Sequence, residues 1–182
     1  MSLLALDDVA CLRGGRLLFE GLSLTLAPGE AALVAGPNGA GKSSLIRLAA
    51  GLLRPAAGKI GRAEAALADE HLALDERQEL GQALAFWVEH AGPGIAAMGL
   101  APLARVPVRI LSAGQRKRAT LARVVASGAP LWLLDEPANG LDGDGLERLE
   151  AAMAAHRAAG GAILAASHQP LGLPGAQTVM LG

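Results

Sequence analysis

The sequence predicts an α/β fold with parallel strands, and three observations support that prediction. Two apolar runs, residues 31–35 and 131–134, are each followed by a loop and then by a helical pattern, as in strand–loop–helix units. The stretch between them, from about residue 69 to residue 128, has a mostly helical pattern. The length of 182 residues suits one domain with a substantial core. We therefore expect a single domain whose core is residues 1–68 and 129–182 and whose helical subdomain is residues 69–128.

The N-terminal segment is expected to form strands. Residues 3–6 and 9–13 are candidates for two strands, and leucines alternate with polar residues over 22–26, which is typical of a half-buried antiparallel strand. Pro28 and Gly29 then form a turn into the strand 31–35.

Helices and further strands follow along the chain. A helix is predicted from Lys42 to about Gly51, whereas the Ala- and Gly-rich residues 56–70 give only a weak indication. The helical stretch after them is predicted to break at Gly92-Pro93-Gly94 and again around residues 102–107. Three more elements are expected near the C-terminus: a helix over 142–159, and strands over 163–167 and 178–181.

The composition excludes several classes of protein. The formal net charge is −1, and the aromatic residues are two phenylalanines and two tryptophans, so we expect no nucleic-acid partner. No apolar run approaches the roughly 18 residues that span a bilayer, so we expect no membrane insertion. Asp7 and Asp8 replace the basic start of a signal peptide, and the lone Cys11 is expected to be a small buried apolar residue in a reducing compartment.

The most specific motif lies directly after the strand 31–35. It reads G-x-x-x-x-G-K-S, the pattern of a phosphate-binding P-loop, and it opens a helix as that motif requires. Glycines let backbone N–H groups approach a polyphosphate, and the helix start adds its positive dipole end. Lys42 is expected to reach the β- and γ-phosphates, and the Ser43 hydroxyl is expected to bind Mg²⁺. The residues assigned to the nucleotide are Gly36, Pro37, Asn38, Gly39, Ala40, Gly41, Lys42, Ser43 and Ser44.

Two adjacent carboxylates follow the second apolar run. Ligands of α/β sheets bind at the carboxyl ends of the strands, which is where Asp135 and Glu136 stand. Asp135 is expected to hold Mg²⁺ through its water shell, and Glu136 to orient and deprotonate the water that attacks the γ-phosphate. The alternative, an acidic turn after a core strand, loses weight beside a P-loop.

A second helix start suited to phosphate occurs at Ser112. This residue is a candidate N-cap, and Gly114 permits close backbone approach at the start of a helix that runs to about Ala126. One nucleotide does not need two such sites from one chain, which points to sharing between subunits. The alternative is an ordinary capped helix with a basic first turn.

The last candidate is His168, which follows the strand 163–167. An imidazole there could hydrogen-bond the γ-phosphate and the attacking water. The alternative is a loop histidine with a surface partner.

Taken in order, these motifs resemble the ATP-binding subunit of ABC (ATP-binding cassette) transporters. Ser112-Ala-Gly114-Gln115 resembles the signature motif, residues 139–142 the D-loop, and His168 the switch histidine. The resemblance implies a cassette with a RecA-like core, an N-terminal antiparallel β subdomain and a short helical signature subdomain. It also implies ATP and Mg²⁺ as cofactors and an ATPase whose catalytic residues are Lys42, Glu136 and His168.

A narrower likeness is to the ATP-binding subunit of the heme exporter used in cytochrome c maturation. It is carried by LSAGQRKR, by WLLDEPANGLD and by the residues His168-Gln-Pro-Leu171. Two positions depart from the general pattern. Arg13 stands where most cassettes have an aromatic residue that stacks on adenine, and His71 stands near the usual Q-loop glutamine, a role for which Gln78 and Gln82 are the other candidates.

The family implies a head-to-tail homodimer in which each ATP lies between one P-loop and the Ser112, Gly114 and Gln115 of the other copy. It further implies permease subunits in the membrane and a peripheral location at the cytoplasmic face of the inner membrane. The alternatives are transport of another cargo, a soluble ABC ATPase acting on DNA or ribosomes, and a P-loop kinase or GTPase.

Overall fold

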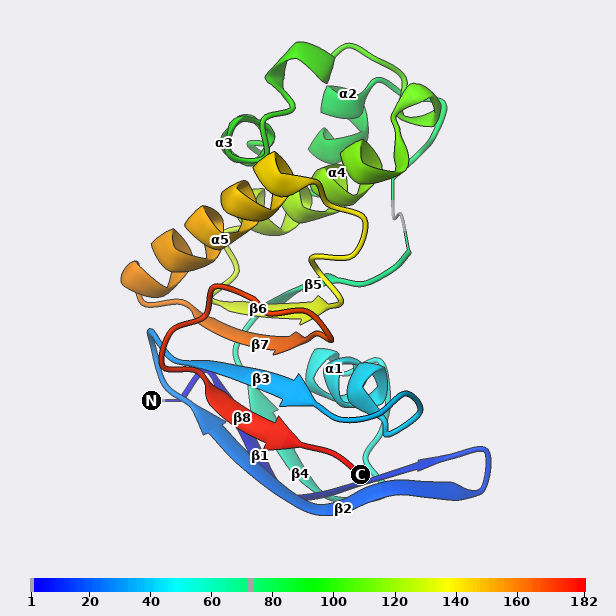
Figure 1. Ribbon diagram of the computed structural model, residues 1–182, viewed down its shortest axis with the longest axis vertical. Coiled ribbons are helices and arrows are strands. Elements are labelled where there is room, and N and C mark those ends of the chain that lie inside the picture. Colours follow the sequence, from blue (N-terminus) through cyan, green and yellow to red (C-terminus); the bar gives the residue numbers. More distant parts are fainter. Residues whose placement is uncertain (1, 72–73) are drawn as a thin grey trace.

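A computed structural model describes residues 2–71 and 74–182. Three layers are stacked along the long axis of the molecule: an antiparallel sheet, a parallel sheet and a group of helices (Figure 1). The cassette fold expected from the sequence is confirmed, since the chain combines an antiparallel N-terminal sheet with a parallel core sheet around the P-loop.

The antiparallel sheet has the strand order β2-β1-β4, with β1 at Leu4–Arg13, β2 at Arg16–Leu26 and β4 at Ala57–Arg62. The prediction of two strands within 3–13 is wrong, because β1 is continuous. Its register against β2 shifts between Leu6 and Val9, where Asp8 has φ 52° and donates its backbone N–H to Ser23 Oγ at 3.0 Å. Such a bulge absorbs extra residues without ending the strand.

The parallel sheet has the order β5-β6-β7-β3-β8, and each neighbouring pair is parallel. The strands are β3 (Ala31–Ala35), β5 (Ala65–Ala68), β6 (Leu131–Asp135), β7 (Ala162–Ala166) and β8 (Gln177–Met180). All residues of β6 and β7 are buried, as expected for strands covered on both faces. Since the strands run in one direction, their carboxyl ends meet at one edge of the sheet.

The predicted helices at the P-loop, at Ser112 and near residue 142 are confirmed as α1 (Lys42–Ala50), α4 (Ala113–Ala126) and α5 (Gly143–Ala158). Short helices α2 (Leu80–Ala85) and α3 (Gly92–Ala97) and two 3₁₀ turns, η1 (Ala101–Leu103) and η2 (Val108–Ile110), fill the segment before α4.

The predicted break at Gly92-Pro93-Gly94 is displaced: the helical stretch is interrupted at residues 86–91, and Gly92-Pro93-Gly94 begin α3. Proline is tolerated in the first turn of a helix, where its missing N–H has no partner to lose. Over residues 2–71 and 74–182, no helix combines the length and the apolar character that crossing a membrane requires.

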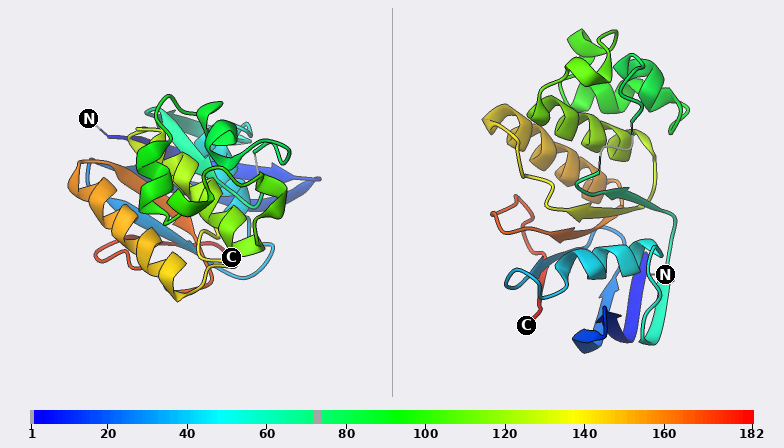
Figure 2. Two further views of the ribbon diagram at one scale, coloured as in Figure 1. Left: turned by 90° about the horizontal axis from the view of Figure 1, so that it is seen from above. Right: turned by 90° about the vertical axis from the view of Figure 1, so that its right-hand side faces the viewer.

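The core lies on both sides of the parallel sheet. On one side α1 packs between the two sheets, as Figure 2 shows in its right-hand view, with Leu45, Ile46 and Leu48 fully buried. On the other side α4 and α5 cover the sheet together with the short helices. Cys11 is buried in the first of these clusters, which confirms that it is a packed apolar residue.

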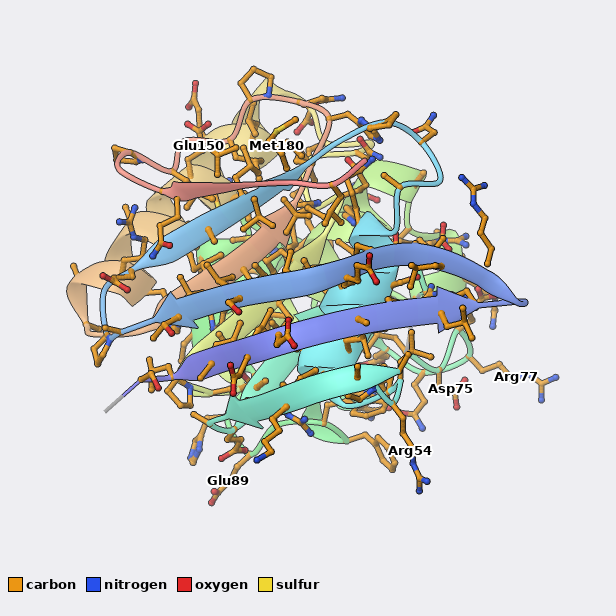
Figure 3. All side chains as sticks on the ribbon, turned by 90° about the horizontal axis from the view of Figure 1, so that it is seen from below. Arg54, Asp75, Arg77, Glu89, Glu150 and Met180 are labelled. Carbon is orange, nitrogen blue, oxygen red and sulfur yellow. The ribbon has the colours of Figure 1, made fainter. Side chains whose placement is uncertain are left out.

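The outer face of the antiparallel sheet forms one end of the molecule. Viewed from below, β2, β1 and β4 face the reader, and Arg54, Asp75 and Arg77 extend from one margin (Figure 3). The P-loop and the carboxyl edge of the parallel sheet lie beyond this layer, between it and the helical group.

A half-buried histidine, His156, joins α5 to the parallel sheet. The rings of His156 and Trp132 are stacked with centroids 3.9 Å apart and planes inclined by 11°, and His156 Nε2 lies 3.3 Å from the carbonyl oxygen of Ala162. Burial lowers the pKa of His156, because the charged imidazolium loses its hydration, while the carbonyls of Ala162 and Pro130 act in the opposite direction.

We expect His156 to make the folded state sensitive to acid. Its pKa is lower in the folded chain, so stability is fully present above the unfolded value of about 6.5 and is lost as the pH falls through that value toward the folded pKa. Between about pH 7.5 and 5.5, the free energy of unfolding in urea should fall more for the parent than for His156→Phe, which cannot titrate. The exposed His90→Gln should behave like the parent. Equal falls in the parent and His156→Phe would contradict the assignment.

Candidate functional site

The P-loop turns from β3 into α1 on glycines. Gly41 caps α1 with φ 105°, and a Cβ atom at this position would lie 3.1–3.2 Å from side-chain carbons of Phe19 and Leu18. Glycine suits this position, because a φ of 105° strains any residue with a side chain and a Cβ atom would also crowd these neighbours. Lys42 is 7% exposed, and its Nζ donates hydrogen bonds to the carbonyl oxygens of Gly36 at 2.8 Å and Pro37 at 3.0 Å. The P-loop backbone therefore wraps around the ammonium group of Lys42.

Asp135 ends β6 with an unpaired oxygen. The residue is 7% exposed, and its Oδ1 is buried with no hydrogen-bond partner in the described part of the chain. Burial raises the pKa of Asp135, while the Ser43 hydroxyl and Arg47 act in the opposite direction. A buried carboxylate oxygen without a partner, beside a hydroxyl, suits a hard cation such as Mg²⁺.

The protein alone does not supply a full cation cage there. Within residues 2–71 and 74–182, no three His, Cys, Asp or Glu side chains gather closely enough to hold a metal ion. Mg²⁺ is commonly held by one or two protein ligands together with substrate phosphates and water. Ser43 and Asp135 therefore fit a cation that arrives with a nucleotide.

Glu136 is held in a strained conformation beside His168. Its φ is 47°, one of two positive values among non-glycine residues of the described chain, and its backbone N–H donates to the Ala166 carbonyl at 2.8 Å. Glu136 Oε1 lies 3.3 Å from His168 Nε2, and Oε2 accepts from the His168 backbone N–H at 3.3 Å. Strain of this kind is often kept where a side chain must be aimed. The ends of β6 and β7 thus present a carboxylate and an imidazole together.

The P-loop, Glu136 and His168 line one cavity of about 530 Å³, whereas Asp135 lines a neighbouring cavity. The first cavity brings together the β1–β2 hairpin, the P-loop and the residues that follow β6 and β7. Its lining is Arg13, Leu18, Asn38, Gly39, Gly41, Lys42, Ser43, Ser44, Glu136, Asn139 and His168. Of these, Leu18 and Asn139 were not predicted as site residues. A cavity with P-loop amides on one wall and a carboxylate and an imidazole on another can hold a polyphosphate and a water molecule.

The residues Ser112, Gly114 and Gln115 do not line this cavity. They form the start of α4 and satisfy one another: Ser112 Oγ accepts from Gln115 N–H at 3.2 Å, and Gln115 Oε1 accepts from Ser112 N–H at 2.9 Å. Gly114 packs so closely that a Cβ atom would lie 2.9 Å from the Gly140 carbonyl oxygen. The helix start is therefore well formed but stands apart from the cavity of its own chain.

His71 lies outside the cavity as well. Its side chain is 71% exposed and pairs with Asp69, with Nδ1 3.2 Å from Oδ2. Gln78 lines a different hollow beside Phe86 and Trp87.

Asp69 and Glu70 instead come to the carboxyl edge of the sheet, because β5 pairs with β6 in a register that sets Ala68 beside Leu134. They line a second cavity, of about 630 Å³, with Ser43, Asp135 and Glu136. Sequence reasoning missed them because the run Ala-Ala-Leu-Ala gave no clear strand signal. The available signal was the pair of carboxylates directly after that run.

Comparison with known proteins gives consistent matches. The ABC transporter family matches residues 19–139. The chain is 57% identical to the cytochrome c biogenesis ATP-binding export protein CcmA of Sphingopyxis alaskensis, over 99% of this chain and 97% of that protein. The protein of the same description from Novosphingobium aromaticivorans is also 57% identical, over 98% and 95% of the two chains. The one from Rhodospirillum rubrum is 47% identical, over 99% and 86%.

Solved structures resemble the chain at lower identity. The ATP-binding subunit of an ABC transporter superposes with a TM-score of 0.83 at 23% identity, over 92% of this chain and 80% of that one. An ABC transporter ATP-binding protein of Pyrococcus furiosus gives a TM-score of 0.83 at 18% identity, over 98% and 96%. At these identities the likeness supports the fold alone.

Proposed function

Because the chain belongs to the ABC transporter family and is an ATP-binding, ATP-hydrolysing subunit, we propose that it powers heme export, or release of a heme chaperone, in c-type cytochrome maturation. The observation that carries the nucleotide chemistry is the cavity of about 530 Å³ in which P-loop, Glu136 and His168 meet. The cargo is supported by two relatives, both cytochrome c biogenesis ATP-binding export proteins, which are 57% identical over nearly the whole chain.

The proposed roles follow from the positions of the side chains. Polyphosphate binds the P-loop amides, and Lys42 exchanges its two carbonyl partners for phosphate oxygens. Glu136 accepts the proton of the attacking water, and His168, 3.3 Å away, steadies the carboxylate and the γ-phosphate. Ser43 and Asp135 hold Mg²⁺, which when bound neutralises charge on the phosphate oxygens.

A second copy of the chain completes the site in this proposal. Ser112, Gly114 and Gln115 present a capped helix start away from their own cavity. In a two-fold dimer the same residues of each copy face the nucleotide of the other, so that two equivalent sites form. Closure around ATP and opening after hydrolysis then give a motion that membrane subunits convert to transport.

Exposed apolar side chains support a membrane partner. Phe86 is 80% exposed, Trp87 47% and Leu52 64%, and the last two line one open hollow of about 1210 Å³. Large exposed apolar groups that gather in one place favour a protein interface. We propose that permease subunits dock there and hold the chain peripherally at the cytoplasmic face of the inner membrane.

The cargo is tested in the organism that encodes the chain. Deletion should abolish covalent heme in c-type cytochromes, measured by heme staining of membrane proteins, and the parent gene should restore it. Glu136→Gln should fail to restore staining, whereas the exposed Glu147→Gln should succeed. Normal staining in the deletion strain would favour a different cargo.

Arg13 is proposed to replace the aromatic residue that usually holds adenine. It lines the cavity at the end of β1, and a planar guanidinium can stack on a base. Arg13→Ala should weaken ATP binding by roughly 3- to 30-fold, the worth of a cation–π contact of about 0.5–2 kcal/mol. The variant Arg13→Phe should bind near the parent level.

The matched control is Arg16→Ala, because Arg16 pairs with Arg13 across the hairpin but does not line the cavity. Calorimetric titration with ATP distinguishes the variants. Arg13→Ala and Arg16→Ala with the same affinity would remove Arg13 from the site.

A further inference from the structure

Three consecutive cations, Arg116, Lys117 and Arg118, occupy the first turns of α4. This placement is unfavourable for the helix itself, because the N-terminal end of a helix carries the positive end of its dipole. No acidic residue stands in the first turn to compensate. The cost must therefore be offset by contacts of these side chains with other parts of the chain.

Arg116 and Arg118 are directly paired. Arg116 Nε donates to the Leu111 carbonyl at 3.0 Å, and its Nη1 lies 3.7 Å from Glu76 Oε1. Arg118 Nη1 donates to Asp144 Oδ2 at 3.1 Å, and the same oxygen accepts from Arg148. These contacts tie the start of α4 to the loop before it and to α5, so both arginines have a structural use.

Lys117 differs from its two neighbours in its pairing. Like Arg116, it is half-buried and lines the cavity of about 630 Å³ that also holds Asp69, Glu70, Asp135 and Glu136. Burial lowers the pKa of Lys117, while these four carboxylates act to raise it. Yet within the described ranges no carboxylate oxygen lies within 4.0 Å of its amine, which distinguishes it from the paired arginines.

We propose that Lys117 is a positioning residue. It couples nucleotide bound in the site of its own copy to the position of α4, and α4 carries the Ser112 and Gly114 that face the partner copy. The charge of the γ-phosphate, which ADP lacks, acts on an ammonium without a close partner more than on paired guanidinium groups when ATP enters beside Ser43 and Asp135. Lys117 and Ser112 lie within two turns of one helix, so a pull on the lysine moves the helix start.

The residues opposite the helix start reinforce this coupling. Gly114 packs on the Gly140 carbonyl, so α4 and the segment that joins β6 to α5 change place together. That segment begins at Glu136, the proposed general base. A displacement of α4 therefore reaches both the partner's site and the residues that follow β6.

The coupling rests on the proposed shared site, and the experiment separates the two. In a Glu136→Gln parent, which should hold ATP without hydrolysing it, ATP-driven dimerisation is measured by sedimentation. Affinity for ADP is measured in the monomer. Lys117→Gln should weaken ATP-driven dimerisation at least tenfold and leave ADP affinity unchanged within about twofold. Lys117→Arg should restore most of the dimerisation.

Lys59→Gln is the control, because Lys59 lies exposed on β4 and is the other lysine outside the P-loop. It should dimerise like the parent. If the Glu136→Gln parent dimerises in ATP and the Lys117→Gln variant dimerises equally well, the coupling is overturned and the shared site is not. A parent that stays monomeric in ATP overturns the shared site and the coupling with it. Loss of ADP affinity in Lys117→Gln would instead make Lys117 a nucleotide ligand or a folding residue, and would also overturn the coupling.

Discussion

Glu136→Gln should reduce ATP turnover by about 10²- to 10⁴-fold, the usual contribution of a general base, while ATP affinity stays within about twofold of the parent. The amide has the same shape as the carboxylate but cannot accept the proton of water. Its oxygen can still accept the backbone N–H of His168, so the local structure should survive. Steady-state phosphate release and equilibrium ATP titration measure the two quantities separately.

The control for this substitution is Glu147→Gln, which removes the same type of charge from an exposed position on α5, away from the cavity. It should keep both turnover and affinity. If Glu136→Gln hydrolysed ATP at the parent rate, Glu136 would not be the base. The carboxylates after β5, Asp69 and Glu70, would then be the next candidates, because they line the cavity that adjoins the same strand end.

Ser112→Arg should abolish hydrolysis by a different route. Ser112 is exposed and outside its own cavity, so a bulky cation there should leave ADP binding by the monomer intact. In the shared site it would fill the space of the partner's phosphate. We expect ADP affinity to stay within about twofold of the parent and ATP turnover to fall at least 10²-fold. In other nucleotide hydrolases, a donor supplied in trans raises the rate by about 10³- to 10⁵-fold.

Loss of the cap must be separated from this effect. Ser112 accepts the Gln115 N–H, and losing such a cap costs about 1 kcal/mol of stability. Ser112→Ala loses the same hydrogen bond without adding bulk, so the two variants should unfold at similar urea concentrations. If Ser112→Ala were as inactive as Ser112→Arg, the loss would belong to the cap or the hydroxyl and not to a blocked shared site.

The sequence predicted those parts of the fold in which a motif adjoins a long apolar run. The strands β3 and β6 and the helices α1 and α4 have such runs and clear starts at Lys42 and Ser112. Both β4 and β5 were missed, because Ala- and Gly-rich segments have little strand propensity and are held by pairing with β1 and β6. Whether a strand forms there depends on the neighbouring strands, which are distant in the sequence, so the local residues do not reveal it.

The same distinction applies to the site. Residues 36–44, 135–136 and 168 were identified from local patterns, and the structure brings residues of each of these segments to one cavity. Asp69 and Lys117 carry no local signal of a shared role. They line one cavity because β5 pairs with β6 and α4 packs nearby. This proximity comes from the tertiary structure and cannot be read from the sequence spacing.

The shared ATP site is tested most directly by mixing two inactive variants. Ser112→Arg and Glu136→Gln proteins are combined at increasing ratios, and ATP hydrolysis is measured. In a mixed dimer one site keeps both Glu136 from one copy and Ser112 from the other, so turnover should rise to a maximum near equal amounts. Random pairing predicts about a quarter of the parent rate there. Turnover that stays at the level of the separate variants at every ratio would contradict a site built from two copies.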